Sequence, residues 1–216
     1  VDSLLGAYRG GIFPWFSEGQ PILWWSPDPR MVLQTARFRL HRSLLRTLRS
    51  FASTPGCEIR FDSSFRTVIE ACSEVPRAGQ SGTWILPKMI EAYVHLHEAG
   101  HAHSVETWID GQLAGGLYCV NIGHAVFGES MFALRPDASK IALAALVAFC
   151  RHHRIAQIDC QQNTAHLASL GAAEMPRSLF LSRVGEALPL PAPQWEFEPV
   201  YWNALPLARP ASTKTT

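Results

Sequence analysis

The chain has 216 residues, of which 47% are hydrophobic and 17% charged, and its 19 basic and 18 acidic side chains give a formal net charge of +1. This composition allows a sizeable buried core and excludes intrinsic disorder for most of the chain, because disorder needs low hydrophobicity and high net charge. The near-zero charge argues against coating of nucleic acid by bulk charge but leaves room for a local basic patch. No apolar run reaches about 18 residues and no secretory signal opens the sequence, so neither a membrane span nor secretion is predicted.

The cysteines indicate the redox compartment. There are five, they are widely spaced, and no Cys-x-x-Cys pair occurs. We therefore expect reduced, mostly buried thiols, as is typical of a cytoplasmic protein.

Residues 1–35 are rich in aromatic residues and in glycine and proline, which predicts irregular, turn-rich structure rather than a long helix. We expect this stretch to form a small aromatic-rich N-terminal subdomain beside a main domain over residues 36–216. Because the sequence starts with Val1 rather than Met, we expect the natural start of the subdomain to lie further upstream. Trp24 and Trp25 are expected to pack in the core.

The main domain alternates between helical and strand periodicities. Helices are predicted over residues 41–51, 64–72 and 88–99. Strands are predicted over residues 104–109, 113–120 and 124–132. Asp137 is expected to cap a helix that reaches about residue 153, followed by a strand over residues 155–161 and short helices over residues 164–170 and 177–188.

From residue 104 this order describes an antiparallel meander of three strands, a crossover helix, a further strand and a helix. It fits an α+β fold of the GNAT type of acyltransferase. In that fold the crossover helix normally begins with a glycine-rich loop whose N–H groups hold the phosphates of coenzyme A. Residues 135–140 contain no glycine, and Asp137 would repel a phosphate. The sequence therefore predicts the fold without the coenzyme.

Four blocks of sequence carry a resemblance to a known family. They are YRGGIFPWF with PILWWSPDPR (residues 8–16 and 21–30), GTWI with EAY and GHAHS (82–85, 91–93 and 100–104), GESMF with ASK (128–132 and 138–140), and IDCQ with His166, SLGA and PR (158–161, 166, 169–172 and 176–177). Through these blocks the chain resembles the leucyl/phenylalanyl-tRNA–protein transferases. That family normally carries a few dozen more residues before the position of Val1.

The resemblance implies a reaction and its partners. Leucine or phenylalanine, and methionine less well, would pass from an aminoacyl-tRNA to the α-amino group of a protein that begins with Arg or Lys. The aminoacyl ester supplies the energy, so no ATP, metal or other cofactor is expected. The added residue would mark the acceptor for N-end-rule degradation by an adaptor-assisted Clp protease in the cytoplasm.

Asp159 and Gln161 are the predicted catalytic residues. At positions i and i+2 of a strand they point to one face, whereas Cys160 points away and is expected to be a small core residue rather than a nucleophile. Aminolysis of an ester needs a neutral amine and a stabilised oxyanion, which a carboxylate and an amide can assist. By spacing alone the pair also fits backbone hydrogen bonding at a strand end, and the resemblance favours catalysis. Either Asp159 or a hydroxyl of the tRNA could take the proton.

The resemblance further implies a pocket for the amino-acid side chain. Its predicted lining is Leu117, Glu129, Ser130, Met131, Leu146 and Ile158. Met131 is unbranched and polarizable and can adapt to both Leu and Phe, although an ordinary core position is the alternative. Glu129 would hold the free α-ammonium of the substrate.

Aromatic and basic side chains are candidates for binding the tRNA. Trp15 and Trp84 are expected to stack on the terminal adenosine, with Tyr8 and Tyr93 as weaker candidates. Residues 30–49 hold six arginines and no acidic residue. Among them Arg42, Arg46 and Arg49 share one helical face, which suits either the phosphates of an acceptor stem or plain solvation.

Two other functions are compatible with parts of the sequence. One is a coenzyme A-dependent N-acetyltransferase, which the missing glycine-rich loop disfavours. The other is a non-catalytic module that binds basic N-terminal residues or RNA, which Asp159 with Gln161 disfavours. A metal site is not predicted, because the histidines at positions 95, 97, 101 and 103 match no zinc-binding spacing.

Overall fold

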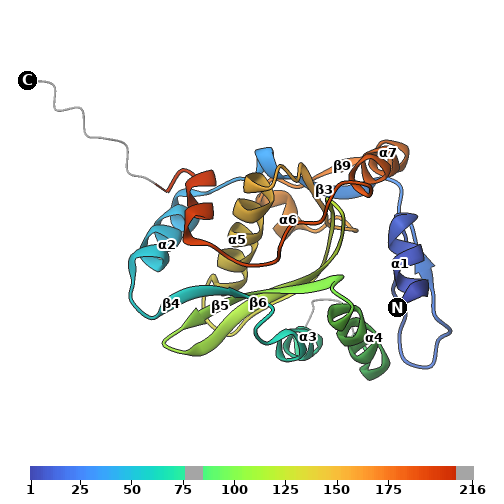
Figure 1. Ribbon diagram of the computed structural model, residues 1–216, viewed down its shortest axis with the longest axis horizontal. Coiled ribbons are helices and arrows are strands. Elements are labelled where there is room, and N and C mark those ends of the chain that lie inside the picture. The colour runs from blue at the N-terminus through green and yellow to red at the C-terminus, as the bar shows by residue number, and fades with distance from the viewer. Residues whose placement is uncertain (76–84, 208–216) are drawn as a thin grey trace, which may run out of the picture.

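A seven-stranded mixed sheet forms the centre of the computed structural model, which describes residues 1–75 and 85–207 (Figure 1). The strand order is β4-β5-β6-β7-β8-β3-β9. The strands are β3 (Arg30–Gln34), β4 (Cys57–Phe61), β5 (Ala102–Ile109), β6 (Gln112–Ile122), β7 (Ala125–Ala133), β8 (Gln157–Asp159) and β9 (Ala173–Met175). β7 and β8 pair in parallel, and the other neighbours pair antiparallel. The fold is therefore mixed α/β.

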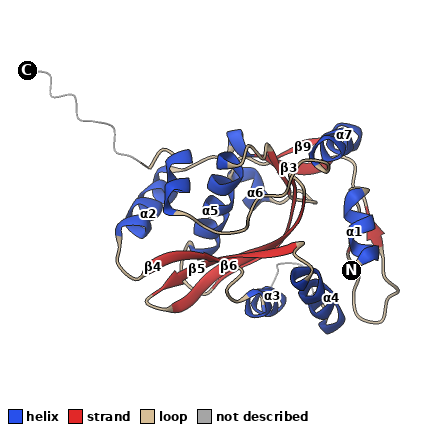
Figure 2. Cartoon of the chain, viewed as in Figure 1, coloured by secondary structure: helices blue, strands red, loops and turns tan. Residues whose placement is uncertain are grey.

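Helices cover both faces of this sheet, as Figure 2 shows. On one face lie α2 (Arg42–Ser53) and α5 (Ala138–His152), and on the other lie α3 (Phe65–Glu74) and α4 (Pro87–Glu98). Each face has its own apolar cluster of buried side chains. The sheet is thus covered on both sides, which explains why β6 is buried along most of its length.

The helix α5 is the most deeply buried helix described. It packs against β5, β6 and β7 on one side and against α2 on another. A C-terminal segment covers it as well, through Trp195, Phe197 and the short 3₁₀ helix η2 (Pro199–Ala204). This enclosure explains why every residue from Ile141 to Cys150 is apolar.

The predicted helices and strands of the main domain are confirmed, with ends shifted by no more than two residues; β8 is shorter than expected by two residues at each end. The last two predicted helices are α6 (Ala165–Ser169) and α7 (Arg177–Ala187). The role given to the Asp137 side chain is wrong. Asp137 precedes α5 with φ of 62° and makes no capping hydrogen bond, because its carboxylate accepts from Lys140 (2.8 Å) and Thr47 (3.4 Å).

The first 35 residues contain more regular structure than the sequence indicated. They form α1 (Asp2–Arg9), a small hairpin of β1 (Phe13–Pro14) and β2 (Trp24–Trp25), and then β3, which joins the central sheet; the 3₁₀ helix η1 (Thr35–Arg37) follows. These elements are short and owe their form to pairing and packing, so periodicity could not reveal them. The domain boundary at residue 35 stays a prediction. None of the described helices is long and apolar enough to cross a membrane.

Candidate active site

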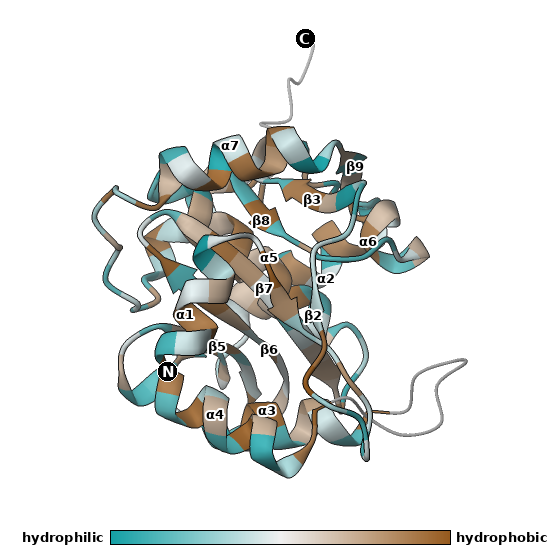
Figure 3. Cartoon of the chain, turned by 90° about the vertical axis from the view of Figure 1, so that its right-hand side faces the viewer, coloured by the Kyte–Doolittle hydropathy of each residue, from teal (hydrophilic) through white to brown (hydrophobic). Residues whose placement is uncertain are grey.

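A cavity lies where β7 and β8 part. The two strands pair only through Val126 with Ile158 and Phe127 with Asp159; β8 then ends, while β7 continues to Ala133. The cavity beside this point has a volume of about 240 Å³. Figure 3 faces this side of the molecule and shows β7 and β8 at the centre, with α1 and α6 on either side. The early end of β8 therefore leaves room for a pocket at the centre of the sheet.

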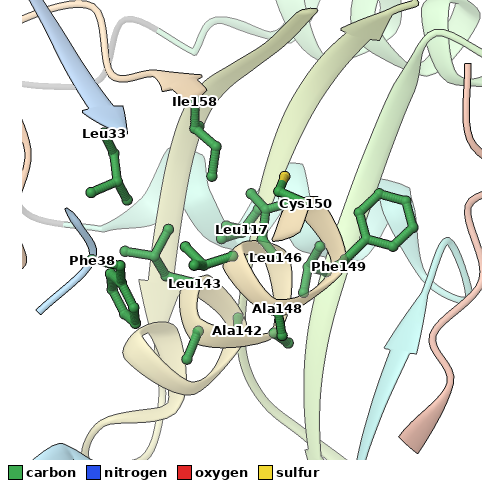
Figure 4. Close-up of a cluster of buried hydrophobic side chains, with 14 of the residues drawn as sticks. Leu33, Phe38, Leu117, Ala142, Leu143, Leu146, Ala148, Phe149, Cys150 and Ile158 are labelled. Carbon is green, nitrogen blue, oxygen red and sulfur yellow. The ribbon is translucent and has the colours of Figure 1, made fainter. Parts of the chain in front are cut away.

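The floor of the cavity is apolar. Leu117 of β6, Leu143 and Leu146 of α5 and Ile158 of β8 line it, and Figure 4 shows these four side chains gathered between the helix and the strands. Met131 of β7 lines it as well. Such a surface favours a branched aliphatic or aromatic group and disfavours a charged one, which would be buried without a partner.

A β-bulge places Glu129 at the polar side of the cavity. In the pairing of β6 with β7, Tyr118 faces Ser130 and Cys119 faces Gly128, so Glu129 is an extra residue with no partner opposite it. A bulge re-aims side chains and is common next to active sites. Here it brings a carboxylate into a cavity whose floor is hydrocarbon.

Glu129 is held by neutral hydrogen-bond donors. Its Oε1 accepts from the hydroxyl of Tyr8 (2.7 Å) and the side-chain amide of Gln161 (2.9 Å), and its Oε2 accepts from the hydroxyl of Tyr93 (3.2 Å). The two tyrosine oxygens are themselves 2.5 Å apart. Burial raises the pKa of Glu129 to about 7, against the opposing effect of the Tyr8 and Gln161 hydrogen bonds. The carboxyl can therefore change charge near neutral pH.

Asp159 has a different environment, because it forms a buried ion pair. Its Oδ1 accepts from Nε of Arg30 (2.8 Å) and its Oδ2 from Nη2 of the same guanidinium (2.6 Å). The exposed fractions of the two side chains are 0% for Arg30 and 2% for Asp159. Oδ1 also accepts the backbone N–H of Gln161 (2.9 Å). The oxygens of Asp159 are thus engaged by protein donors.

A turn after β8, rather than the strand itself, places Gln161 at the site. β8 ends at Asp159, and Gln161 lies beyond it with φ of 62°, in the left-handed region. Its side chain nevertheless meets Glu129, so Asp159, Gln161 and Glu129 form one connected group. The sequence predicted that Asp159 and Gln161 would share a site through alternation along a strand, whereas a turn brings them together.

The structure brings all six predicted pocket residues to the wall of this single cavity, and Asp159 lies on the same wall. Their functional roles stay predictions. Besides Cys160, sequence reasoning did not assign six further residues of the wall to the pocket, which are Leu143, Tyr118, Gly128, Thr164, His166 and Leu167. The helical spacing of Leu143 from Leu146 could have indicated the first, because residues three apart share a face.

The sequence does not indicate the contacts that Arg30 and Tyr93 make with the two carboxylates of the site. Arg30 was counted with the arginines of residues 30–49, but its burial against Asp159 removes it from any basic surface. A charge that directly precedes the apolar run Met31–Leu33 is a usable signal, because a buried arginine needs an acidic partner. Tyr93 was considered only as a stacking ring.

The aromatic residues near the N-terminus differ in how much of each ring is exposed to a ligand. Trp15 is half-buried, with its ring 6.3 Å from that of Trp25. Tyr8 is 1% exposed, so it offers the site its hydroxyl rather than a ring face. Trp84 lies outside the described residues. The expectation that Trp24 and Trp25 pack in the core is wrong, since they are 44% and 45% exposed on the two-residue strand β2.

The three arginines of α2 do not share one environment. Arg42 and Arg46 are exposed. Arg49 is half-buried, and its Nε donates to the carbonyl of Leu207 (2.8 Å) in the C-terminal segment. The basic face available to a ligand therefore consists of Arg42 and Arg46, with Arg49 partly occupied.

Cys160 does not have the properties of a nucleophile. Burial, with a smaller effect of Asp159, raises the pKa of its thiol to about 12, so it is protonated at neutral pH. Within residues 1–75 and 85–207, no three His, Cys, Asp or Glu side chains are grouped as they would be around a metal ion. The absence of a metal from the reaction stays a prediction.

An apolar cavity lined by a carboxyl with a pKa of about 7, with an amide bonded to that carboxyl, is suited to a molecule that has an apolar side chain next to a polar group. The comparisons with known proteins specify the class. A family model described as leucyl/phenylalanyl-tRNA protein transferase matches residues 32–185, and one for the N-terminal domain of the same family matches residues 1–28.

Curated proteins agree with these models. The chain is 63% identical over 205 residues to the leucyl/phenylalanyl-tRNA–protein transferase of a Polaromonas species, covering 95% of this chain and 80% of that protein. It is 64% identical over 206 residues to that of Leptothrix cholodnii, with the same coverage, and 54% identical over 217 residues to that of Methylibium petroleiphilum, covering 99% of this chain and 82% of that protein. The chain belongs to the leucyl/phenylalanyl-tRNA–protein transferase family, and it is an aminoacyltransferase.

Proposed function

We propose that the chain transfers leucine or phenylalanine from aminoacyl-tRNA to the N-terminal Arg or Lys of an acceptor protein, with the cavity between β7 and β8 as the amino-acid site. The observation that carries the proposal is the contrast within this cavity. Leu117, Leu146 and Ile158 supply an apolar floor, whereas Glu129 and Gln161 stand together on its polar side. A leucyl or phenylalanyl ester has the matching division, with an apolar side chain next to an α-ammonium and an ester.

In this arrangement Glu129 holds the α-ammonium of the bound amino acid. Its carboxylate receives only neutral donors from the protein, so a cation of the substrate adds the missing counter-charge. The Gln161 amide lies beside Glu129 and is placed to hydrogen-bond the incoming amine or the developing oxyanion. Trp15, with Trp84, stacks on the terminal adenosine, and Arg42 and Arg46 contact the phosphates of the acceptor stem.

The reaction is an aminolysis. The neutral α-amine of the acceptor attacks the ester carbonyl carbon, a C–N bond forms, and the C–O bond to the ribose breaks. The amine loses one proton and the ribose hydroxyl gains one. The ester supplies the free energy, so the proposal needs no ATP, coenzyme A or metal.

The finer fold assignment is part of this proposal. The order β5-β6-β7-α5-β8, with a meander, a crossover helix and a parallel strand beside β7, supports a GNAT-like acyltransferase unit. The start of α5 supports the loss of coenzyme A binding, because residues 135–138 hold no glycine and the Asp137 carboxylate stands before the helix. The product would then be taken up by a Clp adaptor in the cytoplasm.

The test is transfer from charged tRNA to defined peptides, read by mass spectrometry. A peptide that begins with Arg should gain one leucine residue from Leu-tRNA and one phenylalanine residue from Phe-tRNA. The same peptide with an acetylated N-terminus, and one that begins with Asp, are the controls and should gain nothing. No transfer from either tRNA, or equal transfer to the acetylated peptide, would refute the proposal.

A further inference from the structure

The guanidinium of Arg30 is more completely enclosed than any other cation described. It begins β3, its exposed fraction is 0%, and it lies between the rings of Phe13 (4.8 Å to the ring centre) and Phe180 (4.7 Å). Two of its nitrogens donate to the two oxygens of Asp159. A planar fork held between two rings fixes both the position and the plane of the carboxylate that it binds.

The Asp159 carboxylate also holds the backbone of Gln161 in its turn conformation. Asp159 Oδ1 accepts the backbone N–H of Gln161 at 2.9 Å, and Gln161 has φ of 62°, a conformation that residues with a side chain adopt only when their surroundings hold them. This turn directs the Gln161 side chain to Oε1 of Glu129 at 2.9 Å. A chain of bonded groups therefore runs from Arg30 through Asp159 and Gln161 to the carboxyl that faces the cavity.

We infer that Arg30 is a positioning residue for the transfer reaction. Arg30 holds the Asp159 carboxylate, and that carboxylate holds the left-handed turn at Gln161. The turn keeps the Gln161 amide against Glu129. The inference rests on the proposed transfer reaction. It assigns Asp159 a share in the same task, because both of its oxygens are bound by protein donors, and leaves Gln161 and Glu129 as the groups that meet the substrate. It also gives the N-terminal segment, which supplies Phe13 and Tyr8 as well, a part in arranging the reaction centre.

Lysine in place of Arg30 is the most direct test. Lys keeps the charge but has a single ammonium and cannot form the two parallel bonds that orient the carboxylate. We expect Arg30→Lys to lower kcat for transfer by roughly 10- to 100-fold, because small displacements of aligned groups cost rates of this order. KM for Leu-tRNA should change by less than roughly twofold, since the apolar floor and the tRNA contacts are untouched.

Arg151→Lys is the matched control. Arg151 is a half-buried arginine whose Nε and Nη2 donate to the carbonyl of Thr35 and whose Nη1 donates to that of Ala204, and no hydrogen bond links it to Asp159. This variant should lose stability in a urea titration and keep its kcat. A wild-type kcat in Arg30→Lys, or an equal loss of kcat in Arg151→Lys, would overturn the inference.

A double-mutant cycle separates positioning from a general loss of stability. If Arg30 acts through Gln161, the double variant Arg30→Lys with Gln161→Ala should transfer no more slowly than Gln161→Ala alone. Losses that multiply would show that Arg30 acts independently of Gln161 and would overturn the inference. The assay temperature must lie below the unfolding transition of each variant, which circular dichroism would establish.

Phe180→Leu tests the same point if Arg30→Lys does not fold. It removes one of the rings that flank the guanidinium and leaves the ion pair in place, so it should lower kcat by a smaller factor that again does not multiply with Gln161→Ala. A kcat equal to that of the wild type in folded Phe180→Leu would then overturn the inference. Failure of the proposed function is distinguishable, because in that case the wild-type protein itself would not transfer leucine.

Discussion

Two carboxylates stand close together in this site, and their different partners give them different chemistry. Asp159 is bound by the Arg30 guanidinium, so its charge is neutralised inside the protein. Glu129 is bound by two tyrosine hydroxyls and an amide, and burial raises its pKa to about 7. Neighbouring carboxyls with opposed environments are a common way to divide roles at an active site. Glu129 is therefore the carboxylate that we expect to bind a cation of the substrate.

Asp159→Ala should damage stability as well as transfer. Removing the carboxylate leaves the Arg30 cation buried without a partner, which typically costs about 3–5 kcal/mol. A urea titration should therefore show a large drop in the free energy of unfolding, and the Leu-tRNA assay a strong loss of transfer. As a control, Glu91→Ala breaks the bidentate pair with Arg66 on the surface, where solvent screens the charges, and should lower the free energy of unfolding far less. Equal costs for the two variants would contradict this account.

Met131→Ala should change the preference between the two amino acids. The side chain lines the apolar floor of the cavity, and its truncation enlarges the space that a leucyl group must fill. Transfer of Leu should suffer more than transfer of Phe, because the larger ring can still fill the cavity, with a change in the ratio worth about 1–3 kcal/mol. Competition between Leu-tRNA and Phe-tRNA for one Arg peptide measures it. An unchanged ratio would place Met131 in the core and the selecting surface elsewhere.

At the scale of elements, the β7–β8 pairing and the β7 bulge build the site. If β8 continued beside β7 beyond Phe127, backbone hydrogen bonds would close the gap that now holds the cavity. The bulge adds one residue to β7 opposite β6. The side chains of Glu129 and Met131 therefore both line the cavity, while β6 and β7 stay paired on either side of the bulge. The short pairing of β7 with β8 and the bulge in β7 therefore shape the cavity to which the proposed function assigns the amino acid.

The helix α2 carries the basic surface predicted to bind tRNA. Arg42→Ala with Arg46→Ala should weaken tRNA binding and flatten its salt dependence, because a protein that neutralises fewer phosphates releases fewer counterions when it binds. Arg49→Ala is the matched control, since Arg49 donates to Leu207 and should affect stability more than the salt slope. Filter binding at several salt concentrations measures the slope. An equal loss of affinity for an aminoacyl-adenosine, which has no acceptor-stem phosphates, would contradict a phosphate-binding role.

At the scale of the whole molecule, the site lies where separate parts of the chain meet. Tyr8 comes from α1, Arg30 from β3, Tyr93 from α4, Glu129 from β7, and Asp159 from β8. Hydrogen bonds join Tyr8 and Tyr93 to Glu129 and Arg30 to Asp159, and Gln161 connects the two groups through its backbone N–H and its side-chain amide. The protonation of Glu129 is therefore linked to the stability of the fold as well as to the reaction.

Stability and activity should change in opposite directions as the pH rises from 5 to 8. The pKa of Glu129 is raised from 4.5 to about 7 in the folded state, so its contribution to stability is present below its unfolded pKa and is lost as the pH rises through about 7. We expect the loss to be about 1–3 kcal/mol, reduced by the solvent that reaches the cavity. Under the proposed function the ionised carboxylate holds the substrate ammonium, so we expect kcat/KM to increase over the same window.

Glu129→Gln isolates this effect from other titrating groups, including the α-amine of the acceptor. The difference in unfolding free energy between the wild type and the variant should depend on pH with a midpoint near 7. The variant should also lose the corresponding step in the pH profile of kcat/KM. The same pH dependence in both proteins would show that another group is responsible.

The sequence by itself determined the family, the main helices and strands and six of the residues that line the cavity. Helical and strand periodicity reports which face of an element is buried, and this local signal survives in the fold at α2, α4 and α5. The motifs around Glu129 and Asp159 carried the functional resemblance and predicted which side chains would lie at the site. The expectation that Cys160 points away from the site is wrong, because Cys160 follows the end of β8 and lines the cavity, although burial raises the pKa of its thiol to about 12.

Only the tertiary structure decided how those side chains are arranged. The partner of Asp159 is 129 positions away, and the partners of Glu129 come from three other elements. The bulge at Glu129 depends on the register with β6, and the exposure of Trp24 depends on what the hairpin packs against. Pairing and register are properties of contacts between distant segments. Periodicity along one segment contains no information about them, and for this reason Asp159 looked like a free catalytic carboxylate until the fold placed Arg30 against it.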